Sequence, residues 1–196
     1  MATSLIWLSI VMNLVVLYFF TNWLPAVLIG SGLHTGDAVR TTAYFRVGGT
    51  IGAPVVGYRA DRITPTLVLG VAFACAALFI RIVGSVGANL GLVLPAVFCA
   101  GFCIVDGQAG ANALVGGVYP TRIRATGVGW ALSIGRIGSV VGPVVADWFL
   151  ARGWQSASIL YCAVVPAALA GLAMVAIGRS GQRRPDSTRI TMEKRG

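Results

Sequence analysis

The chain has 196 residues, of which 57% are hydrophobic and only 11% are charged, and it contains 26 glycines. A soluble domain of this length could not bury so large an apolar fraction, so that class is excluded. The composition instead requires a protein that lies in a lipid bilayer.

The apolar residues form long runs, and a stretch such as residues 67–80 is apolar on every side of a helix. A bilayer core of roughly 30 Å needs about 20 such residues per helix, whereas a membrane β-barrel would alternate apolar and polar residues over about ten. We therefore predict an all-α membrane protein, with a six-helix transmembrane domain over residues 1–178 and a disordered basic cytoplasmic tail over residues 179–196. The predicted spans are residues 4–30, 38–58, 66–84, 92–116, 126–149 and 155–178.

The basic residues between the spans predict the orientation of the chain. Ten of the 15 Lys and Arg residues lie in the tail or in the two loops on its side of the membrane, and only Arg40 and Arg152 lie in loops on the other side. Because positive charge near helix ends is retained in the cytoplasm, we predict a multi-pass protein of the cell (inner) membrane with both termini cytoplasmic. This asymmetry accounts for most of the net charge of +9, so no nucleic-acid partner is expected.

Residues typical of enzymes and metal sites are scarce. The lone His34 lies in an outer loop, all four cysteines lie in apolar spans with no histidine beside them, and no H-E-x-x-H or G-x-S-x-G motif occurs. We expect no enzyme activity, no cofactor, no metal site and no disulfide framework. The first 33 residues are uncharged, a stretch too long for the apolar region of a secretory signal.

Two spans carry related glycine patterns. Gly48-x-x-x-Gly52 and Gly138-x-x-x-Gly142 are each followed by a proline and two valines, in the second and the fifth span. These two helices run in opposite directions, as an inverted repeat of three plus three helices requires. The alternative is that G-x-x-x-G only marks close helix packing, which small residues permit in any membrane bundle.

Two loop motifs extend the comparison. Residues 57–62 (G-Y-R-A-D-R) resemble the G-x-x-x-D-R signature of a major facilitator half, although its usual G-R-K ending is replaced by T-P-T at residues 64–66. Residues 119–131 (Y-P-T-R-I-R-A-T-G-V-G-W-A) resemble the region between the tenth and eleventh helices of the aromatic acid:proton symporter family. Residues 22–25 and 107–114 are similar to that family's seventh and tenth helices.

This resemblance covers nearly the whole chain but only the C-terminal half of a major facilitator fold. It implies alternating access with a proton, moving a small organic anion such as a benzoate-type aromatic carboxylate, in partnership with an N-terminal six-helix half or another copy. We expect no transport by the chain alone. A half transporter for another metabolite and a truncated, non-transporting membrane subunit are the alternatives. The resemblance also implies a cytoplasmic gate, to which we assign Gly57, Asp61, Arg62, Arg122 and Arg124.

Two arginines inside the spans are candidates for binding an anion. Arg46 and Arg136 lie deep in the second and fifth spans, where a charged side chain needs a partner or a water-filled cavity. A guanidinium group there can hold a carboxylate through two parallel hydrogen bonds. The alternative is a structural ion pair or carbonyl contact within the bundle.

The fourth span contains three further polar candidates. Asp106 is the one carboxyl near mid-membrane, so it is assigned either to proton coupling or to an ion pair with a buried arginine. Gln108 and Asn112 define a helix face about 160° to 200° away from it, and the family resemblance favours that face as the cavity side. In the first span, Tyr18 and Asn22 stand one turn apart and are further candidates for binding the substrate, or else for bonding between helices.

Overall fold

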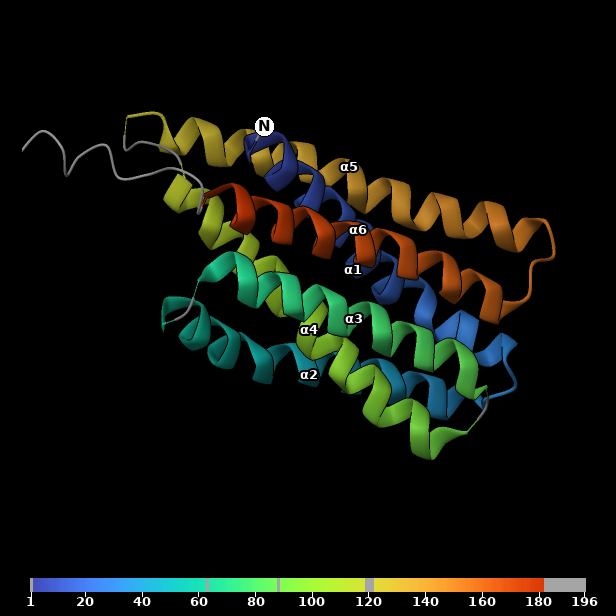
Figure 1. Cartoon of the computed structure of the whole chain (residues 1–196). Coiled ribbons are helices and arrows are strands. Elements are labelled where there is room, and N and C mark those ends of the chain that lie inside the picture. Colours follow the sequence, from blue (N-terminus) through green and yellow to red (C-terminus); the bar gives the residue numbers. More distant parts are fainter. Residues whose placement is uncertain (1, 63, 88, 119–121, 182–196) are drawn as a thin grey trace, which may run out of the picture.

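The computed structural model describes residues 2–62, 64–87, 89–118 and 122–181, and the regular elements in these ranges are all helices (Figure 1). Six helices follow one another, namely α1 Ala2–Gly30, α2 Thr35–Arg62, α3 Pro65–Val86, α4 Leu90–Val118, α5 Arg124–Ala151 and α6 Ser156–Gly181. The predicted fold class, an all-α bundle of six helices, is confirmed.

Short connections make successive helices antiparallel. Pro65 occupies the first turn of α3, where its missing N–H costs no helical hydrogen bond. Gly87 and Gly153 have φ values of 62° and 74° in the turns after α3 and α5, a conformation that side chains with a Cβ rarely adopt. The turns after α1, α3 and α5 lie at one end of the bundle, and the C-terminal ends of α2 and α4 lie at the other (Figure 1).

The helices extend slightly beyond the predicted spans. Each predicted span lies inside one helix, except for Gln155 just before α6. The predicted start of the tail at residue 179 falls within the last turn of α6, where the positive charge of Arg179 suits the negative end of the helix dipole. Residues 182–196, the rest of the predicted tail, lie outside the described residues.

Five of the six helices are long and apolar enough to cross a membrane, and α2 is the exception. Asp37, Arg40 and Arg46 lower its hydropathy. Nevertheless α2 has 28 residues, as many as α5, and packs along α4, so it runs the length of the bundle (Figure 1).

The neighbours of each helix show the internal symmetry. Helix α2 packs along α4 and α5 packs along α1, while α3 packs against α4 and α6 packs against α1. Exchanging the first three helices for the last three converts each of these pairs into another, and the α3–α6 pair into itself. The packing is therefore that of a three-plus-three inverted repeat.

The paired glycines make equivalent contacts in the two repeats. A Cβ atom added at Gly48 would strike the carbonyl oxygen of Phe98 in α4, and one added at Gly138 would strike that of Val11 in α1. One turn further along, the second glycine of each motif again faces the same neighbouring helix. Both motifs thus allow two backbones to approach closely. The two explanations of the glycine pattern, close helix packing and an inverted repeat, therefore both apply.

The apolar core is divided along the bundle axis. One cluster, which includes Phe20 stacked on Phe45 with ring centroids 5.5 Å apart, fills the end that holds the turns after α1, α3 and α5. A smaller cluster around Ile10 and Phe73 fills the other end. Between them lies a mid-bundle layer with three buried or half-buried polar side chains, those of Asn13, Asp106 and Gln108, which we call the polar layer.

Candidate functional site

Three amide side chains form a hydrogen-bonded cluster in and beside the polar layer. Nδ2 of Asn13 in α1 donates to the carbonyl oxygen of Ile104 at 3.2 Å and to Oε1 of Gln108 at 2.8 Å. Nε2 of Gln108 then donates to Oδ1 of Asn112 at 3.0 Å, one turn along α4. Asn13 is buried, whereas Gln108 and Asn112 are half-buried. The cluster links the first helices of the two repeats at the depth where transporters of this architecture bind substrate.

Asn13 was not among the residues predicted for the site. It lies 95 positions from Gln108, so nothing local identifies its partner. A weaker signal was present, because Ser9 and Asn13 are four residues apart in the mostly apolar stretch of residues 5–17 and share one helix face. Ser9 also bonds across the bundle, from its hydroxyl to the carbonyl oxygen of Ala170 at 3.2 Å.

Asp106 lies on the other side of α4, against α2. Its side chain is 1% exposed, and its carboxylate contacts the position that a Cβ of Gly52 would occupy. Neither carboxylate oxygen has a hydrogen-bond partner among the described residues. The ion pair in the described part of the chain joins the exposed Arg40 to the half-buried Asp37, near the start of α2. The ion pair expected for Asp106 with a buried arginine is therefore not formed in the described part of the chain, because Arg46 points away from α4.

Arg46 and Arg136 occupy equivalent positions in the two repeats. Each precedes the first glycine of its motif by two residues, which on a helix is about 200° of rotation. Since Gly48 faces α4 and Gly138 faces α1, both arginines point away from the neighbouring helix, and both are exposed. They are the twelfth and thirteenth residues of helices 28 residues long, so both lie near mid-membrane depth.

Tyr18 and Asn22 lie on the exposed side of α1. Nδ2 of Asn22 donates to the backbone carbonyl of Tyr18 at 2.9 Å, and Tyr18 is 40% exposed. The recorded hydrogen bonds join Gln108 to Asn112 and Asn22 to Tyr18, but they do not join these pairs to each other or to the arginines. In the described residues the predicted binding residues thus form separate groups on α1, α2, α4 and α5.

Comparisons with known proteins agree with this architecture. The Major Facilitator Superfamily profile matches residues 6–195. The chain belongs to the major facilitator superfamily. Its relatives include the gallate transporter of Pseudomonas putida, 37% identical over 92% of this chain and 40% of its own length. The 4-hydroxybenzoate transporter PcaK of Pseudomonas aeruginosa is 38% identical over 90% of this chain and 39% of its own length. The 3-(3-hydroxy-phenyl)propionate transporter of Escherichia coli is 31% identical over 88% of this chain and 43% of its own length.

This major facilitator chain spans about two fifths of the length of these relatives. The resemblance to aromatic acid transporters is confirmed, and the relatives are transporters rather than enzymes. Among the described residues no cluster of His, Cys, Asp and Glu is suited to a metal ion, and the four cysteines are free thiols.

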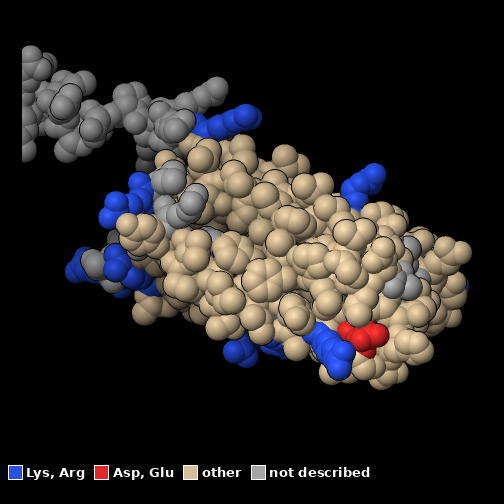
Figure 2. Space-filling view, turned by 90° about the horizontal axis from the view of Figure 1, so that it is seen from below, with Lys and Arg blue, Asp and Glu red and all other residues tan. Residues whose placement is uncertain are grey.

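The predicted gate residues of this major facilitator chain lie at its basic end. Figure 2 shows Lys and Arg side chains gathered at one end of the bundle, with few along its flank. The guanidinium carbon of Arg62 lies 4.8 Å from the ring centroid of Tyr58, and Arg122 and Arg124 are exposed. Gly57 and Asp61 lie in the last turns of α2, but the side chain of Asp61 is outside those that the structure describes.

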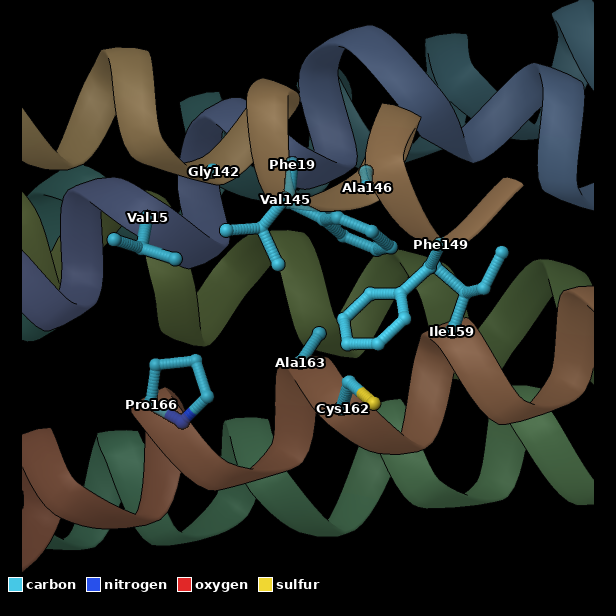
Figure 3. A pocket seen from close by; sticks show the side chains of 10 residues that line it. All are labelled: Val15, Phe19, Gly142, Val145, Ala146, Phe149, Ile159, Cys162, Ala163 and Pro166. Carbon is cyan, nitrogen blue, oxygen red and sulfur yellow. The ribbon is translucent and has the colours of Figure 1, made fainter. Parts of the chain in front are cut away.

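A small cavity lies between α1, α5 and α6 of the same chain. It holds about 130 Å³, and apolar side chains that include Val15, Phe19 and Phe149 line it (Figure 3). The repeat makes Phe19 the counterpart of Asp106. Gly48 meets the carbonyl of Phe98, eight residues before Asp106, and Gly138 meets the carbonyl of Val11, eight residues before Phe19. The repeats therefore place an acid at one such junction and an aromatic ring at the other. A cavity whose lining offers no polar side chain except the weakly polar thiol of Cys162 does not suit a carboxylate ligand.

Proposed function

We propose that this chain is the C-terminal half of a proton-coupled symporter for a small aromatic carboxylate, which works by alternating access with an N-terminal six-helix half or another copy. The observation that carries the proposal is the pair of equivalent arginines, Arg46 and Arg136, at mid-membrane depth on uncovered helix faces. The names of the relatives support the substrate class, since gallate, 4-hydroxybenzoate and hydroxyphenylpropionate are all hydroxylated aromatic carboxylates.

The two arginines require a covering partner. A guanidinium group at mid-membrane depth is costly against lipid and is normally turned toward protein or water. In helix α5, which carries Arg136, only 22% of the most apolar 18-residue stretch is buried inside the bundle, whereas the corresponding share in the four other apolar helices is 39% to 50%. A second six-helix half packed on this side would cover α5 and enclose a cavity between the arginines and the amide cluster.

Asp106 is our candidate for the proton site. A buried carboxylate without a donor or a cation is costly, and taking up a proton removes that cost. Because Gly52 has no side chain, the carboxyl group lies directly against the backbone of α2 at this residue, and a small separation of α2 from α4 would open this contact to water. Proton exchange would then be linked to helix movement.

Uptake assays test the function. Cells that express this chain together with its N-terminal half should accumulate labelled 4-hydroxybenzoate, and a protonophore should prevent the accumulation. Phenol, which lacks the carboxylate, should not compete. Asp106→Asn keeps the size of the side chain but cannot release a proton, so it should still allow exchange of labelled for unlabelled substrate while losing accumulation. Equal accumulation by Asp106→Asn and the native protein would reject Asp106 as the proton site.

A non-transporting membrane subunit, the alternative considered from the sequence, is the second candidate. The same assay decides between them. Uptake that requires both halves supports the transporter, and a stable chain that gives no uptake with any second half supports the subunit.

The orientation is proposed from the basic end, which we place in the cytoplasm together with the gate of Asp61, Arg62, Arg122 and Arg124. A reporter fused after Gly196 is expected to be active in the cytoplasm, and one inserted at His34 is expected to be exterior. Cysteine accessibility at the same two positions is an independent measurement. The reverse pattern at both positions would overturn the orientation.

A further inference from the structure

The amide cluster has a direction that the surrounding backbone determines. Amide oxygen and nitrogen atoms have similar sizes, so their assignment must come from their partners. The side chain of Asn13 contacts the carbonyl oxygen of Ile104, which can only accept a hydrogen bond. The atom that Asn13 presents there must therefore be its nitrogen.

This assignment passes along the cluster one residue at a time. The same nitrogen of Asn13 faces Gln108, so Gln108 must present its oxygen to Asn13 and its nitrogen to Asn112. Asn112 must then present its oxygen to Gln108. Its own nitrogen remains directed away from the cluster, with no hydrogen bond recorded among the described residues, on a side chain that is only half-buried.

We propose that Asn13 is a positioning residue. It fixes the side-chain amide of Asn112 so that its NH₂ group points outward, where it can donate a hydrogen bond to an acceptor group of the substrate but cannot pair with a donor. This rests on the proposed function for the identity of the substrate. A hydroxylated aromatic carboxylate has two kinds of acceptor, the carboxylate and the ring hydroxyl oxygen, and either one fits a donor at Asn112.

Two substitutions of Asn13 separate orientation from packing. Asn13→Leu has a similar size but forms no hydrogen bond, so Gln108 and Asn112 lose their fixed direction. Asn13→Asp also has a similar size but presents only acceptors, so it attracts the nitrogen of Gln108 and reverses the cluster, leaving the oxygen of Asn112 outward. The substrate acceptor would then meet an acceptor.

The side-chain amide signals of the purified chain test the direction without any substrate. In ¹⁵N NMR with hydrogen–deuterium exchange, the NH₂ groups of Asn13 and Gln108 should be protected and that of Asn112 should exchange fastest. In Asn13→Asp the NH₂ group of Asn112 should become protected. If the native NH₂ group of Asn112 is the better protected one, the direction is wrong and the proposal fails, whatever the chain transports.

Uptake kinetics of the complete transporter test the consequence for the substrate. The KM should rise about tenfold in Asn13→Leu and further in Asn13→Asp, with the maximal rate and the protein abundance nearly unchanged. A rise for both benzoate and 4-hydroxybenzoate would place the carboxylate at Asn112, and a rise for 4-hydroxybenzoate alone would place the ring hydroxyl there. An unchanged KM in both variants, or a loss confined to abundance, would overturn the role of Asn13. Failure of the native protein to take up either acid would instead refute the proposed function.

Discussion

Replacing Arg136 by glutamine is expected to lower the uptake of an aromatic acid by about 100-fold or more, because two charge-assisted hydrogen bonds to the carboxylate are lost together. Arg136→Lys should retain part of the uptake, since lysine keeps the charge but lacks the planar fork of the guanidinium group. Both variants should reach the membrane in normal amounts, because Arg136 is exposed in this half and lies on the side of α5 away from α1.

Arg152 offers a matched control. Its guanidinium carbon lies 3.4 Å from the ring centroid of Trp148, in the turn after α5 and away from mid-membrane. Arg152→Gln should therefore leave uptake near the native level. Normal uptake by Arg136→Gln would show that the anion is bound elsewhere, with Arg46 as the next candidate, and a mere loss of protein would make Arg136 a packing residue.

Gly138→Ala is expected to destabilise the bundle by roughly 1–3 kcal/mol, because the new methyl group would meet the backbone of α1 rather than a side chain that can move aside. The helices α1 and α5 would have to separate. Gly48→Ala should have a similar cost at the α2–α4 contact, since the two glycines are equivalent in the repeat. Thermal unfolding of the purified protein in detergent measures both effects.

Gly129 lies in the same helix as Gly138, but a Cβ atom added there would meet nothing within 4 Å. Gly129→Ala should be neutral or slightly stabilising, because alanine favours a helix over glycine by about 1 kcal/mol. If Gly138→Ala were as stable as Gly129→Ala, the close approach of α1 and α5 would be refuted.

Much of the fold was predictable because a bilayer imposes strong constraints on sequence. Five long apolar runs and the less apolar stretch of α2 determine six helices, and short polar connections leave only antiparallel neighbours. The repeat was also predictable, since Gly48 and Gly138 stand in the same local pattern. The equivalence of Arg46 and Arg136 follows from that pattern as well, although their exposure depends on which faces α4 and α1 cover.

The site was predictable only in part, because its contacts join residues far apart in the chain. Helical geometry correctly separates Asp106 from Gln108, and the structure places the first against α2 and the second against α1. Nothing in the sequence shows that Asp106 faces Gly52, because the register between two helices depends on the packing of both. The same limit applies to Asn13, whose partners lie on α4.

The division of the core has a consequence for the local stability of the bundle. Among the described residues the cluster at the end away from the basic loops contains 22 buried side chains, whereas the one at the basic end contains 10. Separating the helices at the basic end therefore exposes less of the described apolar core to water. Fluctuations that open the bundle locally should concentrate at the basic end, while the end with the larger cluster stays rigid. The polar layer, whose hydrogen bonds can exchange with water, is the boundary between the two ends.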